Sequence, residues 1–227
     1  MKFLLFSFLS LPMYAGVVLF APVPPVWDTI LKQGQALIEE KLKEEQNLQH
    51  VFEPSLYVPH ISLAYLSDEE LTMDKLELQE KALDSELQEF AQTTRCIALD
   101  NLKHTKINAW KGSKPATYQE KNYNNYAILV AKMEPSEQLT KAVEKLDTLL
   151  LKHPAFLKRK FLPFAPHLTF GYLYAKDDSY PKAMVEKLTP LLQNLIDKAH
   201  TQAQPFAIDS FTLSTHDKKT KVYQFQK

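Results

Sequence analysis

Hydrophobic and polar positions along this chain follow two alternating periods. Short apolar runs that are rich in β-branched residues and end at prolines, such as residues 16–23, are typical of buried strands. Between such runs, apolar residues recur every three or four positions, as in residues 27–46, and this spacing is typical of amphipathic helices. The pattern therefore predicts a mixed α+β protein.

The same order of elements is predicted twice along the chain. The first half is expected to have strands at 16–23 and 55–66, helices at 27–46 and 67–92, and hairpin strands at 96–110 and 125–134. The second half is expected to have a helix that opens at Ser136, a strand at 164–173, a helix at 180–200 with Pro181 near its first turn, and a closing hairpin at 204–217 and 221–227. Ser67 can cap the second helix, with Glu70 three residues on. The polar segment 111–125 is expected to be a mobile loop.

This repetition predicts one supersecondary unit used twice, with no linker between the copies. We expect a single α+β domain over residues 16–227. It should have two pseudo-symmetric lobes, each an antiparallel sheet with helices on the outside, and an active-site cleft between them.

One strand is written nearly twice, as "PHISLAYL" at 59–66 and "PHLTFGYL" at 166–173. Because residues i and i+2 of a strand point to the same side, His60 shares a face with Ser62, and His167 shares a face with Thr169. A single histidine of this kind is usually structural, satisfied by local hydrogen bonds. A chance repeat of the pattern among 7 histidines is on the order of one per cent at ordinary composition. The paired motif therefore favours a functional role for the two histidines over a structural one.

Composition narrows the chemistry that these residues can perform. Lysine plus arginine and aspartate plus glutamate number 27 each, so no overall field draws the chain to polyanions or membranes. The 4 glycines form no glycine-rich phosphate cradle. The single cysteine, Cys96, excludes an internal disulfide and a cysteine-based zinc cluster, and we expect a buried, inert thiol rather than a reactive one.

The paired motif resembles that of the two-histidine (2H) phosphoesterase superfamily, which includes bacterial 2′-5′ RNA ligases, 2′,3′-cyclic nucleotide phosphodiesterases and the exoribonucleases that trim U6 small nuclear RNA. The resemblance runs from about residue 16 to the C-terminus, in element order as well as motif. It implies that His60, Ser62, His167 and Thr169 line the cleft and hydrolyse a phosphodiester with no metal and no cofactor. The implied substrates are RNA ends or small nucleotides.

The chemistry of the four side chains agrees with this implication. Histidine titrates near neutral pH and can act as general base or general acid, and sequence alone does not say which histidine takes which role. The two hydroxyls can donate hydrogen bonds to the non-bridging phosphate oxygens. The alternative from another class is a nucleotide- or RNA-binding module of the same fold that has no turnover.

Two tyrosines occupy the fifth position after each motif histidine. In bacterial RNA ligases of the superfamily this place in the second motif usually holds an arginine, whereas here Tyr65 and Tyr172 stand in the two copies. They are candidates for substrate binding by stacking on a base, and packing is an equal alternative. Four lysines around the central loop are either a polyanion contact or, as we favour, a solvated surface: Lys103, Lys106, Lys111 and Lys114.

The N-terminal segment has the layout of a secretory signal peptide. Residues 1–15 contain one lysine, an apolar run from Phe3 to Leu11, and a small residue at Ala15 that precedes the expected cleavage site. The run is too short to cross a membrane as a helix. We therefore expect an exported, monomeric protein with no membrane contact in its mature form, or a cytoplasmic one if the segment is not cleaved and packs on the domain instead.

If residues 1–15 are a signal peptide, the mature protein begins at Gly16 and keeps its first strand whole. Deletion of these residues should then leave the melting temperature and the activity unchanged, because the segment has no partner in the folded domain. N-terminal sequencing of protein from the producing organism tests this prediction. An intact Met1 in a cytosolic fraction, or unfolding of the deletion variant, would contradict it.

Overall fold

The computed structural model describes residues 17–23, 25–44, 49–55, 59–66, 72–74, 81–99, 104–152, 164–200, 206–215 and 219–226. The first part of the chain forms β1 (Val17–Pro22), α1 (Pro25–Glu44), β2 (His50–Pro54), β3 (His60–Leu66), α3 (Lys81–Thr93) and β4 (Ile97–Leu99). The middle forms β5 (Lys106–Lys111), β6 (Ala116–Tyr118), β7 (Lys121–Tyr123), β8 (Tyr126–Lys132) and α4 (Glu137–Leu150). The last part forms β9 (His167–Ala175), α5 (Lys182–His200), β10 (Phe206–Ile208), β11 (Ser210–Ser214) and β12 (Thr220–Gln224).

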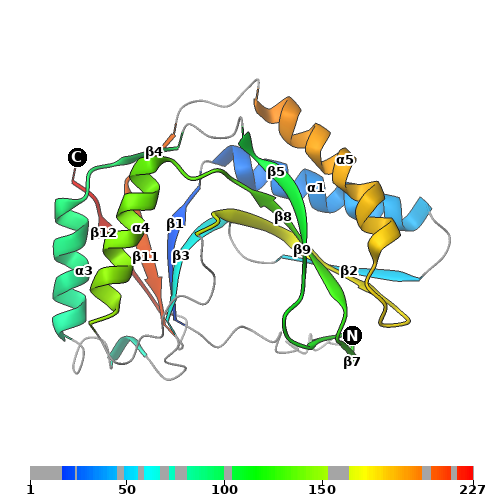
Figure 1. Cartoon of the computed structure of the whole chain (residues 1–227), viewed down its shortest axis with the longest axis horizontal. Helices are drawn as coiled ribbons and strands as arrows, with labels where there is room; N and C mark the ends of the chain where they lie inside the picture. The colour runs from blue at the N-terminus through cyan, green and yellow to red at the C-terminus, as the bar shows by residue number, and fades with distance from the viewer. Residues whose placement is uncertain are drawn as a thin grey trace, which may run out of the picture.

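Two antiparallel sheets of four strands each hold one copy of the doubled strand (Figure 1). The first sheet has the order β12-β11-β1-β3, with β3 at its edge. The second has the order β2-β9-β8-β5, with β9 inside it. Two short pairs, β10-β4 and β6-β7, complete the described strands.

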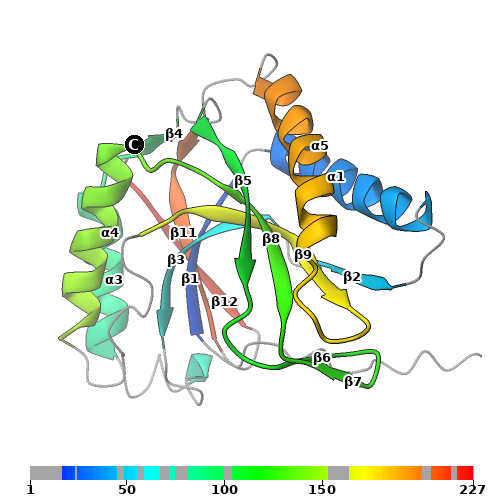
Figure 2. The same ribbon diagram turned by 45° about the vertical axis from the view of Figure 1, so that its right-hand side comes forward.

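Helices cover the outer side of each sheet (Figure 2). Helices α3 and α4 pack on the first sheet, and α1 and α5 pack together on the second. This arrangement confirms the expected α+β fold with a helix-covered antiparallel sheet in each of two lobes.

The lobes do not correspond to the two halves of the sequence. The first sheet combines β1 and β3 with β11 and β12 from the far end of the chain, while α1 and β2 belong to the other lobe. The expectation that each half builds one unit is therefore wrong. Strand pairing and helix packing exchange elements between the halves, and this exchange makes the two lobes one structure.

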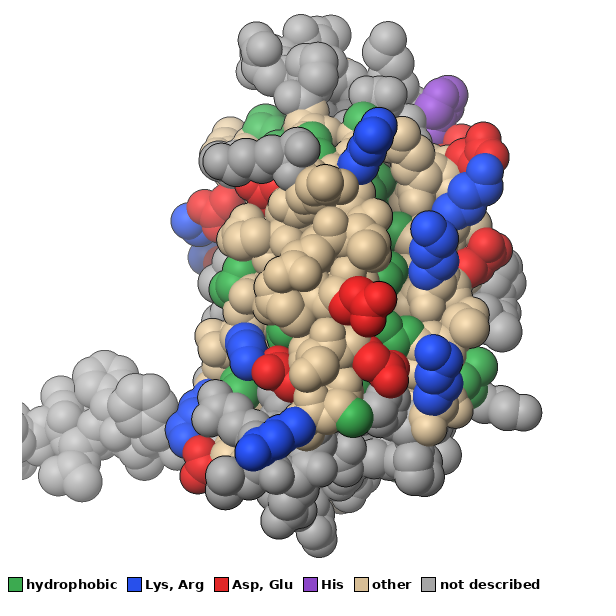
Figure 3. All heavy atoms as spheres, turned by 90° about the vertical axis from the view of Figure 1, so that its left-hand side faces the viewer, with side chains coloured by type: hydrophobic (Ala, Val, Ile, Leu, Met, Phe, Trp, Pro, Cys, Tyr) green, Lys and Arg blue, Asp and Glu red, His purple; other side chains and the backbone are tan. Residues whose placement is uncertain are grey.

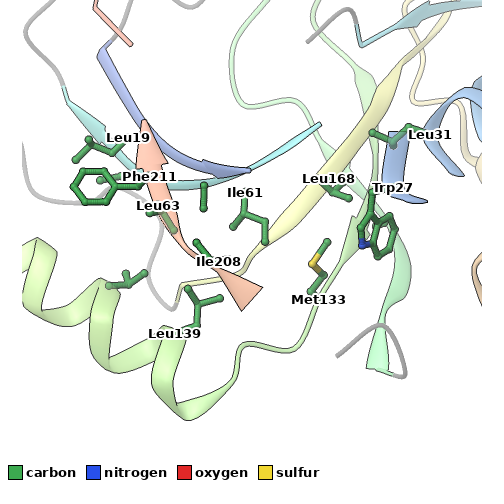
Figure 4. Close-up of a cluster of buried hydrophobic side chains, with 14 of the residues drawn as sticks. Leu19, Trp27, Leu31, Ile61, Leu63, Met133, Leu139, Leu168, Ile208 and Phe211 are labelled. Atoms are coloured by element: carbon green, nitrogen blue, oxygen red, sulfur yellow. The ribbon is translucent and has the colours of Figure 1, made fainter. Parts of the chain in front are cut away.

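Among the described residues, one large hydrophobic cluster lies behind both motif strands (Figure 4). Ile61 and Leu63 of β3 are buried in it, as are Leu168 and Phe170 of β9. Burial of their apolar surface is the main driving force that holds the two sheets together. The alternate residues of both strands consequently face away from this core.

Several local expectations are confirmed. Ser136 caps α4, because its side chain accepts a hydrogen bond of 3.1 Å from the amide of Leu139. The strand at 16–23, the helix at 27–46, the helix after Pro181 and the two hairpin pairings β5-β8 and β11-β12 also form. The proposed cap at Ser67 and the segment 1–15 lie outside the described residues.

Other expectations need correction. The expected strand at 96–110 is two strands, since β4 pairs with β10 and β5 pairs with β8. The expected mobile loop at 111–125 contains the β6-β7 hairpin, which packs its tyrosines on the second sheet. Cys96 is half-buried rather than fully buried.

Charge on the surface follows the neutral composition. On the face of the molecule that carries α3 and α4, basic and acidic side chains are interspersed (Figure 3). In the part of the chain that the structure describes, none of the helices has both the length and the apolar character needed to cross a membrane.

Candidate active site on the two motif strands

The first motif begins β3 at the edge of its sheet. His60 is opposite Pro22 and Ser62 is opposite Phe20 of β1, and both motif side chains are half-buried. The rings of His60 and Phe20 have their centroids 5.0 Å apart at an interplanar angle of 54°. The aromatic ring therefore restrains the imidazole at the end of the strand.

The second motif begins β9. His167 and Thr169 are half-buried, while Leu168 between them is buried in the core. The indole ring of Trp110 in β5 meets the His167 imidazole edge-on, with centroids 4.5 Å apart and an angle of 67°. Sequence reasoning missed Trp110, since it is 57 positions from His167 in the chain and only the sheet brings the two together.

Hydrogen bonding defines the proton positions on His167. Its Nδ1 lies 2.9 Å from the carbonyl oxygen of Ala165. Because a carbonyl can only accept, Nδ1 carries the hydrogen and donates it. In the neutral ring, Nε2 is then left with a lone pair that can accept a proton.

Burial lowers the pKa of His167 below its ordinary value of 6.5. The hydrogen bond to Ala165 raises this pKa and the charge of His60 lowers it, but desolvation has the largest effect. His167 is therefore neutral at pH 7, in the tautomer that exposes the Nε2 lone pair.

The structure brings the two motifs together. Strands β3 and β9 lie side by side where the two sheets meet (Figure 1), and His60 is close enough for its charge to affect the pKa of His167. One histidine and one hydroxyl residue thus come from each sheet into one region.

A β-bulge follows the second motif and changes which residues share its face. Thr169 is opposite Val130 and Gly171 is opposite Leu129, so Phe170 is an extra residue without a partner in β8. Beyond the bulge, Tyr172 is opposite Ile128. Since Ile128 and Val130 are two apart in β8, Tyr172 lies on the same face as Thr169. Strict alternation would have put Tyr172 on the other face.

The first motif has an irregularity at the same place. Ser62 is opposite Phe20 and Ala64 is opposite Leu19, so Leu63 is the extra residue of β3. The backbone of Tyr65 pairs with Val18, but its side chain lies outside the described residues. Both copies of the strand therefore combine a motif with a bulge three residues after the histidine.

Tyrosine side chains fill the motif face of the second sheet beyond the bulge. Tyr174 and Tyr126 are buried with ring centroids 5.3 Å apart, and half-buried Tyr172 is 6.2 Å from Tyr126. The β6-β7 hairpin covers them with Tyr118, which stacks on Tyr174 at 5.5 Å and 13°, and with buried Tyr123. Tyr172 thus borders an aromatic cluster on one side and the motif on the other.

A carboxylate from β2 is bonded inside this cluster. The hydroxyl of Tyr174 donates a hydrogen bond of 2.5 Å to Oε2 of Glu53. Burial raises the pKa of Glu53, and the bond from Tyr174 lowers it by a smaller amount. Burial, the bond and the charge of Glu53 all raise the pKa of Tyr174.

Within the described ranges, no three histidine, cysteine, aspartate or glutamate side chains gather where they could hold a metal ion. Lys106, Lys111 and Lys114 are exposed, and Lys103 lies outside the described residues. The four motif residues and their aromatic neighbours therefore form the candidate site.

Comparison with solved structures supports the class of fold. Usb1 of Kluyveromyces marxianus aligns with a TM-score of 0.54 at 11% identity, covering 92% of this chain and 97% of that one. The structure of the same protein with uridine monophosphate aligns with a TM-score of 0.51 at 10% identity, with the same shares covered. No protein-family model and no curated protein matches the sequence. This chain therefore shares the fold of Usb1 over nearly its whole length.

The half-buried carboxyl of Glu53 predicts a specific pH dependence of stability. Because its pKa in the folded protein is raised above 4.5, its contribution to stability is full below pH 4.5 and is lost as the pH rises through the folded pKa. Glu53→Gln keeps an acceptor for Tyr174 and removes this ionisation. The free energy of unfolding of Glu53→Gln, relative to the natural protein, should therefore increase between pH 4 and pH 7, as measured by urea unfolding.

The control for this prediction is Glu89→Gln, since Glu89 is exposed on α3. The change in Glu53→Gln between pH 4 and pH 7 should exceed the change in this exposed control over the same range. A Glu53→Gln change no larger than that of the control would show that burial does not raise the Glu53 pKa.

Proposed function

We propose that this protein is a metal-independent phosphodiesterase that hydrolyses a 2′,3′-cyclic phosphate or a 2′-5′ linked nucleotide, free or at an RNA end. The observation that carries the proposal is the meeting of two histidine–hydroxyl pairs from separate sheets. In-line displacement at phosphorus needs a base for the nucleophile on one side and an acid for the leaving oxygen on the other. Two histidines can supply both proton transfers.

His167 is the general base in this proposal, and His60 is the general acid. The Nε2 lone pair of His167 takes a proton from water while the water oxygen bonds to phosphorus. The bond from phosphorus to the 2′-oxygen breaks, and protonated His60 gives its proton to that oxygen. The hydroxyls of Ser62 and Thr169 donate hydrogen bonds to the non-bridging oxygens, which carry the negative charge of the transition state.

A base-binding role for Tyr172 belongs to the same proposal. Trp110, Ile128 and Tyr172 are opposite one another on three neighbouring strands, and all three are half-buried. This row has an aromatic ring at each end and lies one step beyond Thr169, which suits a base attached to the phosphate, because every base can stack on a ring. Tyr65 has the equivalent role after the first motif, and the uridine monophosphate bound to Usb1 is a ligand of this chemical class.

The second candidate function is a nucleotide- or RNA-binding module without turnover. It would use the same aromatic row and hydroxyls. A binder has no need for a histidine held in a proton-accepting tautomer, and the bond from Nδ1 to Ala165 therefore favours the enzyme. For the mature protein we further propose export and a monomeric state.

Turnover of defined substrates is the test of the proposed reaction. We expect the purified protein to hydrolyse 2′,3′-cyclic AMP or 2′-5′ oligoadenylate in the presence of EDTA, monitored by chromatography of the products. Loss of activity in EDTA would overturn the metal-independent mechanism. Binding without turnover of any substrate would favour the binding module.

Removal of either histidine should lower kcat more than removal of either hydroxyl. His60→Ala and His167→Ala should each lower kcat by up to about 10⁴-fold, because neither proton transfer has a substitute. Ser62→Ala and Thr169→Ala should each cost about 10²-fold, since each removes one of at least two donors. His104→Ala, at an exposed histidine outside the motifs, is the control and should keep the full rate. A folded His60→Ala variant with full activity would disprove the paired mechanism.

The pH dependence should reflect the lowered pKa of the base. With His167 as base and His60 as acid, kcat/KM should follow a bell-shaped curve that reports two pKa values of the interacting pair. Because burial lowers the pKa of His167, the rate should rise on the acidic side of the curve with a midpoint below pH 6.5, the ordinary pKa of histidine. Steady-state kinetics from pH 4 to pH 9 measure this curve. An acidic limb well above pH 6.5 would instead assign the base to another group.

A further inference from the structure

Strands β2 and β9 stop pairing beside the bulge of β9. The pairing of β2 with β9 ends where Pro54 is opposite Gly171. The next amide, that of Ser55, donates a hydrogen bond of 2.9 Å to the carbonyl oxygen of Phe170. After Ser55 the chain leads to the first motif at His60. On β9, the second motif directly precedes Phe170.

A single side-chain amide from helix α1 connects Ser55 to Phe170 of β9 at this point. Nε2 of Gln35 donates one hydrogen bond of 3.0 Å to the carbonyl of Ser55 and another of 2.9 Å to the carbonyl of Phe170. The two protons of one amide nitrogen are thus used on two different chain segments. The Phe170 carbonyl, at the bulged residue, accepts from both Gln35 and Ser55.

Glycines allow the helix and the strands to approach this closely. A Cβ atom on Gly34 would lie 2.4 Å from Cε1 of Phe170, so α1 contacts the bulge through the Phe170 ring as well as through its carbonyl. A Cβ atom on Gly171 would lie 2.3 Å from the carbonyl oxygen of Glu53 in β2. At both distances a Cβ atom would force a neighbouring atom to move. The junction is therefore built for direct contact between α1, β2 and β9.

We infer that Gln35 is a positioning residue that sets the two catalytic motifs in register with each other. Ser55 precedes His60 by five positions, and Phe170 follows Thr169 directly. By holding both carbonyls, Gln35 connects the segment that leads into the first motif to the residue that leaves the second. This inference rests on the proposed function, because it assigns Gln35 to the alignment of that reaction.

Alignment of this kind has a recognisable kinetic effect. A displacement of about 1 Å between reacting groups can cost on the order of 10²-fold in rate. The two hydrogen bonds from Nε2 of Gln35 go to backbone carbonyls, on the side of β9 that α1 covers. Its loss should therefore lower kcat and leave KM nearly unchanged, whereas a residue that binds substrate would raise KM.

Gln35→Leu tests the inference, and Gln193→Leu is a matched control. Gln193 also bridges a helix to the second sheet, because its Nε2 donates to the Thr105 carbonyl at 3.1 Å and its Oε1 accepts from the Ile107 amide at 2.9 Å. It lies on α5 beside β5, away from the bulge.

Kinetics on 2′,3′-cyclic AMP well below the melting temperature should show kcat reduced about tenfold or more in Gln35→Leu, with KM within twofold. Gln193→Leu should show no such loss. Gln35→Glu, which keeps the size and removes both donors, should behave like Gln35→Leu if the latter does not fold.

Hydrogen exchange at Ser55 separates failure of this inference from failure of the proposed function. The Ser55 amide should exchange faster in Gln35→Leu and at the natural rate in Gln193→Leu, whether or not the protein has activity. Unchanged exchange at Ser55, a Gln35→Leu kcat within twofold of the natural value, or equal losses in both variants would each overturn the inference. If the natural protein turns over no substrate, the proposed function fails and the exchange result alone decides whether Gln35 holds the junction.

Discussion

The burial of one face of β3 and one face of β9 in a common core is the constraint on which the rest of the structure depends. Ile61 and Leu168 are each the middle residue of a motif, and both are almost completely removed from water. Because side chains alternate along a strand, their burial forces the flanking histidine and hydroxyl residues to the opposite side. Hydrophobic packing in this way sets the orientation of the polar groups that the proposed reaction uses.

The bulge of β9 is the second feature that orients side chains, and it interrupts the regular alternation described above. A regular strand would send the residues after each motif alternately to the core and to the site. One extra residue, Phe170, reverses this order and brings Tyr172 to the side of Thr169. An interruption of the ladder leaves a backbone carbonyl that needs a partner, and Gln35 and Ser55 provide it from outside the strand. The irregularity of β9 and the polar contact from α1 are consequently parts of one feature.

Local features were predictable wherever the responsible interactions are close in sequence. The cap at Ser136 depends on an amide three residues away, and the helical periods depend on residues within a few turns. The segment 111–125 was misjudged for the converse reason. Its polar composition resembles a loop, but Tyr118 and Tyr123 find partners on β9, about 50 residues later in the chain. The exchange of strands between the lobes was equally invisible, because strand partners across a sheet are set by long-range packing.

The sequence by itself determined that a histidine and a hydroxyl residue share a face of a strand, twice, since this follows from the two-residue period of an extended backbone. It also determined the mixed α+β composition and the neutral charge. Only the tertiary structure decided that the two faces come together, that Trp110 contacts His167, that Tyr172 lies on the face of Thr169 and that Gln35 connects Ser55 to β9. The reason is that these relations join segments that are far apart in the chain, and the packing of the whole core selects them rather than any local preference.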